Sequence, residues 1–212
     1  MQQEMLVQKG YKKRNGYYTF VRFLGWFLSH TFLPATFYNR EQLDMQAPYI
    51  LISNHNSMLD PLYISHACKR YQIRWLGKKE IAKMPVICWF AKKMNMIHVD
   101  RHNTDMAAMR QCMASIKSGE VLGIFPEGTR HQPSLMHEVE SGTAFIALRA
   151  GVPLLPVYFD KKISFFRKAN AYVGEPMDIT ALKAEGMNTE TVAKLCKDIQ
   201  ETFFALRDAA KK

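Results

Sequence analysis

The sequence predicts an α/β domain in which helices flank a largely parallel central β-sheet. From Pro48 onward, short apolar runs that end at polar residues or at Gly and Pro alternate with longer stretches of helical periodicity. This alternation is typical of parallel strands joined by helices. The composition agrees, because 48% hydrophobic and 23% charged residues in a chain of 212 are ordinary for a globular protein with one core.

The individual elements follow from these runs. Strands are expected at five places, namely 49–53, 73–76, 96–99, 121–125 and 154–159. Helices are expected at 61–70, 80–93, 104–118, 141–150 and, as a charged amphipathic stretch, 189–210. In parallel sheets, functional residues gather in the loops that follow the carboxyl ends of strands. We therefore expect functional residues in the loops after the first and fourth of these strands.

The net charge indicates a negatively charged partner. There are 29 Lys and Arg against 19 Asp and Glu, which gives +10, and residues 1–110 alone carry +9. Such an asymmetric basic half suggests nucleic acid, an anionic membrane surface or a phosphorylated substrate. A mean hydropathy of -0.21 excludes a protein that crosses the membrane many times.

Cysteine usage and the amino terminus predict a cytosolic location. The four cysteines show no C-x-x-C pattern, and we interpret them as reduced, mostly buried thiols: Cys68, Cys88, Cys112 and Cys196. The polar start MQQEMLVQKG carries no signal-peptide cleavage pattern, which argues against secretion.

Residues 1–40 differ from the rest and are expected to form a membrane-associating segment ahead of a domain at 41–212. A basic cluster at 12–14 precedes the aromatic stretch YYTFVRFLGWFLSHTFLPATFY at 17–38. The uncharged part, 23–39, has 17 residues, fewer than the ~20 that a spanning helix needs.

The aromatic spacing in this segment is helical. Phe20, Phe23 and Phe27 follow i, i+3, i+7 and would share one helix face. Aromatic bulk beside basic residues suits an amphipathic, membrane-facing helix that lies among the headgroups. A helix that packs back on the domain as part of its core is the alternative, and the sequence leaves both open.

The first candidate loop is SNHNSMLDP, which directly follows the strand at 49–53. It contains an H-x-x-x-x-D pair, His55 and Asp60, and the Asp60-Pro61 step is typical of a helix start with Asp60 as N-cap. A loop that folds back over five residues can bring the carboxylate to one imidazole nitrogen and leave the other free to take a proton. The alternative is that Asp60 only caps its helix. Ser57 is interpreted as a hydrogen-bonding loop residue and not as a nucleophile.

The second candidate loop is FPEGTR at 125–130, which directly follows the strand at 121–125. Pro126 and Gly128 favour a tight turn, and Arg130 offers a planar fork for a phosphate group. Gly123 and Gly128 have the spacing of a P-loop, but Thr-Arg follows where Lys-Ser/Thr is required, so nucleotide hydrolysis is not expected. A plain turn at a strand end is the alternative for this loop alone.

Taken together, four ordered blocks resemble those of the glycerolipid acyltransferases, the family of 1-acylglycerol-3-phosphate acyltransferases. The blocks are NHNSMLD (54–60), MIHVDR (96–101), FPEGTR (125–130) and VPLLPV (152–157). The resemblance covers about residues 48–160. It implies a glycerolipid-acyltransferase-like fold and transfer of a fatty acyl group to a lysolipid hydroxyl.

Carried over to this chain, the resemblance implies His55 as base and Asp60 as its orienting partner. Arg101 and Arg130 would hold the acceptor phosphate. Glu127, Gly128 and Thr129 would complete the substrate site. No metal or other cofactor is implied, since acyl-CoA or acyl-carrier protein serves as co-substrate.

The chain departs from the family pattern near the second and third blocks. Asn95 and Met96 stand where glycine is usual, and His98 stands where proline is common. Beyond FPEGTR, the chain has Glu140-Ser141-Gly142 where the family often has a lysine before a glycine. These departures concern the acceptor head group more than the chemistry.

Three alternatives come from other classes. A metal-dependent hydrolase could use His98 with His102, or His131 with His137, although no H-E-x-x-H occurs. A nucleic-acid-binding protein would explain the charge, but no motif of that class is visible. A lipid-binding protein without activity is the third.

The expected function is therefore that of a 1-acylglycerol-3-phosphate O-acyltransferase of phospholipid biosynthesis, with an acyltransferase for a different lysolipid as the alternative. Its partners would be an anionic membrane surface, a lysophospholipid acceptor and a thioester donor, with no nucleic acid. It would act at the cytoplasmic side of the cell membrane as a peripheral or monotopic protein.

Overall fold

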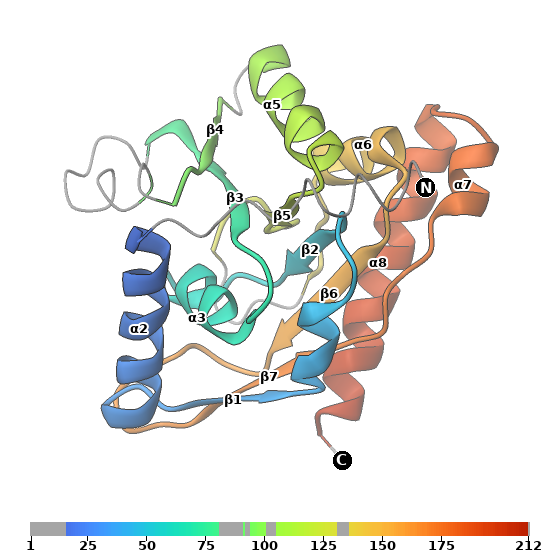
Figure 1. The fold of residues 1–212 in the computed structure, drawn as a ribbon. Coiled ribbons are helices and arrows are strands. Elements are labelled where there is room, and N and C mark those ends of the chain that lie inside the picture. The colour runs from blue at the N-terminus through green and yellow to red at the C-terminus, as the bar shows by residue number, and fades with distance from the viewer. Residues whose placement is uncertain (1–15, 81–90, 92–93, 101–104, 131–135, 212) are drawn as a thin grey trace.

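A computed structural model of the chain describes residues 16–80, 91, 94–100, 105–130 and 136–211 (Figure 1). The basic cluster at 12–14, most of the helix expected at 80–93, and Arg101 lie outside the described residues.

Within the described residues, seven strands form one sheet in the order β1–β7–β6–β2–β5–β3–β4 (Figure 1). They are β1 (Ala35–Tyr38), β2 (Ile50–Ser53), β3 (Ile73–Lys78), β4 (Ile97–Val99), β5 (Val121–Ile124), β6 (Leu154–Phe159) and β7 (Ala169–Val173). Neighbouring strands run parallel except for β6 and β7, which are antiparallel. The sheet is mixed and mostly parallel, so the predicted α/β class is confirmed.

The five predicted strands are all present, whereas β1 and β7 were not predicted. Residues 35–38 were assigned to the N-terminal helical stretch, but they pair with β7 at the edge of the sheet. β7 runs antiparallel to β6 and belongs to no β-α-β unit. A functional boundary near residue 40 stays a prediction, and the sheet includes β1 from before it.

Helices occupy the other predicted places that are described: α3 (Asp60–Ala67), α5 (Met106–Lys117), α6 (Ser141–Ala150) and α8 (Thr189–Ala209). A short helix, α7 (Thr180–Ala184), and a 3-10 helix, η1 (Arg40–Asp44), were not predicted. The long α8 begins with a capping box, in which Asn188 and Thr191 satisfy each other's backbone N–H groups.

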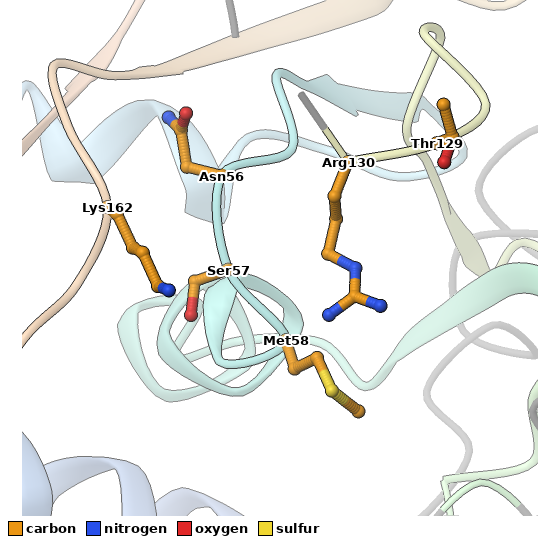
Figure 2. Close-up of a pocket in the computed structure, with 6 residues that line it drawn as sticks. All are labelled: Asn56, Ser57, Met58, Thr129, Arg130 and Lys162. Carbon is orange, nitrogen blue, oxygen red and sulfur yellow. The ribbon is translucent and has the colours of Figure 1, made fainter. Parts of the chain in front are cut away.

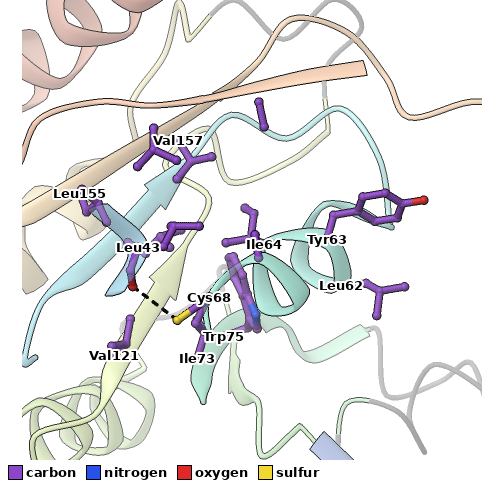
Figure 3. Packing of buried hydrophobic residues seen from close by; sticks show 14 of the residues in the cluster. Leu43, Leu62, Tyr63, Ile64, Cys68, Ile73, Trp75, Val121, Leu155 and Val157 are labelled. Carbon is purple, nitrogen blue, oxygen red and sulfur yellow. Dashed lines mark hydrogen bonds between the residues drawn. The ribbon is translucent and has the colours of Figure 1, made fainter. Parts of the chain in front are cut away.

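The sheet separates two hydrophobic cores, as the alternation of side chains along β2 illustrates. Leu51 faces the core beneath α2 (Gly16–Thr31) and α3, whereas Ile50 and Ile52 face the core beneath α5, α6 and α8 (Figure 1). Figure 3 shows the first core, where Trp75 and the residues of α3 pack over the central strands. These two layers fix the carboxyl ends of β6, β2 and β5 beside one another.

Helix α2 packs one face on the domain and exposes the other. Tyr18, Val21 and Gly25 are buried, and a Cβ at Gly25 would lie 2.8 Å from the Cβ of His66 in α3, so only glycine allows this close approach. The opposite side, called here the outer face of α2, consists of exposed aromatic side chains: Tyr17, Phe20, Phe23, Trp26 and Phe27. The helix therefore contributes to the core and also carries the predicted aromatic stripe.

No helix in the described part of the chain combines the length and the hydropathy needed to cross a membrane.

Candidate active site

The loop between β2 and α3 brings His55 and Asp60 together, as their spacing predicts. Nδ1 of His55 lies 2.9 Å from Oδ2 of Asp60, whose side chain is fully buried, while the His55 side chain is 17% exposed. Because a carboxylate only accepts hydrogen bonds, Nδ1 carries the proton and Nε2 keeps a lone pair. The pair thus presents an oriented imidazole whose second nitrogen can accept a proton.

Asp60 folds the loop instead of capping the helix, which corrects the predicted N-cap. It is the first residue of α3, with Leu59 at the N-cap position. Its Oδ2 accepts the backbone N–H groups of Asn56 at 2.8 Å and Ser57 at 2.7 Å. Burial raises the pKa of the Asp60 carboxyl, and the hydrogen bonds from His55, Ser57 and Asn56 oppose that rise. Ser57 is a hydrogen-bonding loop residue, since its Oγ accepts the Leu59 N–H at 3.2 Å.

A stack of three rings fixes the plane of the His55 imidazole. His55 lies on Phe125 with centroids 4.0 Å apart, and Phe125 lies on Trp75 with centroids 5.0 Å apart. Trp75 in turn donates its Nε1–H to Oγ of Ser65 in α3. A Cβ at Gly123 would lie 2.5 Å from the Trp75 ring, so Gly123 is needed for space and not for phosphate binding.

The FPEGTR loop, residues 125–130, helps to hold the backbone of His55 in place. Gly128 adopts φ 71°, in the left-handed region, and its N–H closes the turn onto the Phe125 carbonyl at 3.0 Å. Glu127 is buried, and its carboxylate accepts the backbone N–H of His55 at 3.2 Å and of Met136 at 3.1 Å. Glu127 therefore joins the two candidate loops.

Asn54 connects the His55 loop to the carboxyl end of β6 by hydrogen bonds. Its Nδ2 donates to the carbonyl of Phe159 at 2.9 Å, and its Oδ1 accepts the Phe159 N–H at 2.8 Å. These two bonds continue the pairing of β2 with β6 beyond the last backbone pair. The His55 loop is thus held by all three neighbouring elements, β6, α3 and the loop after β5.

A pocket of about 560 Å³ lies at the carboxyl ends of β2, β5 and β6, against the loop that carries the His55–Asp60 pair (Figure 2). Its lining includes Asn56, Ser57, Met58, Thr129, Arg130 and Lys162. Figure 2 shows Arg130 and Lys162 reaching from opposite sides toward Ser57 and Met58. Neither cation forms an ion pair within the part of the chain that the structure describes. The pocket therefore favours an anionic ligand.

Two of the seven predicted site residues line this pocket, and four more belong to the same two chain segments, 54–60 and 125–130. His55 and Asp60 form the pair, Thr129 and Arg130 line the pocket, and Arg101 lies outside the described residues. The sequence interpretation missed Lys162, although Lys161-Lys162 directly follows the strand LLPVYF and its aspartate. It also missed the ring stack, whose only signal was Phe125 at the start of FPEGTR.

Among the described residues, no three His, Cys, Asp or Glu side chains are grouped so that they could hold a metal ion. His102 and His131, which the metal alternative requires, lie outside the described residues.

One protein-family model matches the chain over most of the central sheet. The family model described as Acyltransferase matches residues 34–160, from the start of β1 to the end of β6. Because this match spans more than half of the chain, the chain belongs to the acyltransferase family.

Relatives and one solved structure agree with this assignment. The chain is 28% identical over 184 residues to the 1-acyl-sn-glycerol-3-phosphate acyltransferase of Streptococcus pneumoniae, covering 84% of this chain and 67% of the relative. It is 28% identical over 145 residues to the Bacillus subtilis protein of the same name, covering 66% and 72%. The crystal structure of the 1-acyl-sn-glycerophosphate (LPA) acyltransferase PlsC from Thermotoga maritima matches with a TM-score of 0.63 and 20% identity. That match covers 97% of this chain and 88% of the other, and it establishes the shared fold.

Proposed function

We propose that this protein transfers a fatty acyl group from a thioester donor to the free hydroxyl of 1-acyl-glycerol-3-phosphate, which yields phosphatidate for phospholipid biosynthesis. The observation that carries the proposal is the His55–Asp60 pair at 2.9 Å, in a loop whose residues 56–58 line a pocket with two cations. The names of the relatives from Streptococcus and Bacillus support the choice of acceptor.

In the proposed reaction, Nε2 of His55 takes the proton of the acceptor hydroxyl while that oxygen attacks the thioester carbonyl. The new C–O bond forms, the C–S bond breaks, and the proton passes from His55 to the departing thiolate. Asp60 holds the imidazole in the required tautomer and stabilises its protonated form. A base positioned in this way contributes ~10²–10⁴-fold to the rate. No covalent acyl-enzyme is needed, because the acceptor attacks directly.

Arg130 and Lys162 are proposed to bind the acceptor phosphate. Arginine offers a planar fork that matches two phosphate oxygens, and lysine adds a second charge from the other side of the pocket. Glu127 and Gly128 shape the floor beneath the glycerol by fixing the two loops, and Thr129 lines the pocket beside Arg130. Arg101, from the second block, remains a predicted further phosphate ligand.

The outer face of α2 is proposed to attach the protein peripherally to the cytoplasmic side of the cell membrane. Its five exposed aromatic side chains would enter the headgroup region, where aromatic rings are favoured. Lysophosphatidate and phosphatidate both reside in a bilayer, so a site at the membrane surface shortens the path of each.

An acyl-transfer assay with purified protein tests this function. The assay crosses lysophosphatidate, lysophosphatidylglycerol and lysophosphatidylethanolamine with acyl-CoA and acyl-carrier-protein donors, and a folded His55→Ala variant is the control. We expect transfer to lysophosphatidate that the variant lacks. Acylation of only the other lysolipids would contradict the proposed acceptor, and absence of transfer with every pair would contradict the proposed function.

A further inference from the structure

The connection between β6 and β7, residues 160–168, carries the two most exposed large hydrophobic side chains among the described residues. Phe165 is 67% exposed and Phe166 is 78% exposed. Ile163, only two residues before Phe165, is buried in the core beneath α2 and α3. The base of the connection is therefore anchored while its tip presents two adjacent phenyl rings to the surroundings. Exposed apolar surface of this kind indicates a binding partner.

The tip packs against the residue that follows α2. The Phe166 N–H donates to the carbonyl of Phe32, just beyond α2, at 2.9 Å, and the two rings meet edge to face with centroids 6.4 Å apart. Figure 1 shows the connection passing the carboxyl end of α2. Phe166 also adopts φ 56°, which a bulky residue rarely does, so these contacts hold its backbone in an otherwise disfavoured conformation.

The charges around the two rings identify the chemistry of the partner. Four exposed cations flank the pair: Lys161, Lys162, Arg167 and Lys168. Lys161 pairs with Asp160 at 3.6 Å, and the other three form no ion pair within the described residues. A second copy of this chain would bring like charges together at such a surface. An anionic lipid surface complements the cations and also accepts the rings.

We propose that residues 160–168 are a second membrane-docking element, and that their partner is the surface of an anionic lipid bilayer. The choice of a lipid partner rests on the proposed function. Lys162 lies three residues before Phe165 and lines the pocket beside Arg130. Insertion of the two rings therefore sets the phosphate-binding side of the pocket at headgroup depth, where the acceptor phosphate resides.

Vesicle binding of the full chain tests the proposal. Sedimentation with vesicles of phosphatidylcholine and phosphatidylglycerol compares the parent protein with Phe165→Ser/Phe166→Ser. We expect the partition coefficient to fall roughly tenfold or more, because two phenyl rings no longer enter the apolar region. The matched control is Met187→Ser, an exposed apolar residue between α7 and α8 on the other side of the sheet, which should bind as the parent does.

A second variant separates docking from a merely structural role. Phe165→Trp/Phe166→Trp should restore or exceed parental binding, because indole rings favour the membrane interface. Thermal unfolding of each variant verifies the fold. Parental binding by a folded Ser variant would overturn the proposal. So would a parent protein that proves to be a dimer, if this variant became monomeric and still bound vesicles.

The outcome is distinguishable from that of the proposed function. Weaker vesicle binding by the Ser variant supports the docking element even if no acyl transfer is detected in any assay. Full acyl transfer on vesicles together with unchanged vesicle binding by the Ser variant overturns the docking element alone. On a short-chain acceptor dissolved as monomers, the Ser variant should turn over at the parental rate.

Discussion

Two loops follow neighbouring parallel strands at the same edge of the sheet, and they differ in the burial of their side chains. In residues 54–60, after β2, the polar side chains Asn54, Asn56, Ser57 and Asp60 are all buried, and the loop is hydrogen-bonded to β6, to α3 and to Glu127. In residues 160–168, after β6, the tip exposes two phenyl rings and four cations.

The contrast separates two requirements of one protein. A proton-transferring group must be held in a single geometry before the substrate arrives, so its loop is bonded on every side. A surface that docks on a fluid partner needs exposed apolar and charged groups, so its loop is anchored at Ile163 and through the Phe166–Phe32 contact while its rings and cations stay exposed. In the proposed function at the membrane both loops are needed, and each can be damaged without the other.

The largest effect is expected from the loop at 54–60. His55→Ala should lower kcat by about 10²–10⁴-fold, because no group remains to take the hydroxyl proton in the transition state. Asp60→Asn should cost a comparable factor, because the imidazole loses the partner that sets its tautomer. Steady-state kinetics on folded protein measure both. Near-parental turnover by His55→Ala would remove the chemical role of this loop.

The next largest effect is expected at the pocket between the two loops. Arg130→Lys should lower kcat/KM for the acceptor by roughly tenfold or more, since a point charge does not replace a bidentate contact. The donor KM should change less. Arg149→Lys, an exposed residue in the last turn of α6, is the matched control. Equal acceptor kinetics in both variants would place the phosphate elsewhere.

A comparable effect, confined to membranes, is expected from the outer face of α2. Phe23→Ser/Phe27→Ser should weaken binding to anionic vesicles roughly tenfold, because two exposed rings no longer enter the interface. Substitutions are preferable to deletion of residues 1–40, since that deletion would also remove β1 from the sheet. High salt should weaken parental binding only in part, because the apolar contribution remains. Undiminished binding by this variant would limit α2 to core packing.

A smaller effect is expected at Gly123, which packs against the Trp75 ring of the stack that supports His55. Gly123→Ala forces the Trp75 ring to move, because the new Cβ would lie 2.5 Å from it. The free energy of unfolding should fall by about 1–3 kcal/mol, which lowers the Tm by roughly 2–10 °C. Gly142→Ala, at an open position in α6, is the control and should not destabilise the fold. If Gly123→Ala were as stable as its control, the ring stack would not constrain His55.

The smallest effect is expected at two buried thiols, those of Cys68 and Cys112. Burial raises the pKa of Cys68, directly after α3, and of Cys112, in α5, to about 11 each. Both groups stay protonated at neutral pH, and the reactive thiolate should form only as the pH approaches 11. Peptide mapping after alkylation at pH 7 should therefore find both unmodified in the folded protein. Rapid modification of Cys68 would show that the core at the carboxyl end of α3, opposite the end that carries Asp60, opens readily.

Local sequence patterns predicted much of this arrangement. The five apolar runs predicted their strands because each ends at a turn signal, and the H-x-x-x-x-D spacing predicted the contact between His55 and Asp60. β1 escaped prediction because ATFY continues an uncharged aromatic stretch, and its partner β7 lies more than 130 residues further along the chain. Local patterns do not reveal such distant pairings.

The supporting residues of the site were hidden for the same reason. Trp75 reaches His55 only through Phe125, a contact that exists because β3, β5 and β2 are neighbours in the sheet. Lys162 reaches the pocket because β6 lies on the other side of β2. Strand order, which no motif spacing encodes, decides which side chains meet.

The comparison between the two loops is tested most directly by one set of rates. Acyl transfer to lysophosphatidate is measured with a monomeric short-chain acceptor and with a vesicle-bound acceptor, for the parent, His55→Ala and Phe165→Ser/Phe166→Ser. We predict that His55→Ala loses transfer with both acceptors and still binds vesicles. Phe165→Ser/Phe166→Ser, called here the docking-loop variant, should lose transfer only on vesicles. Near-parental transfer by folded His55→Ala, or equal losses with both acceptors in the docking-loop variant, would contradict the division of work between the two loops.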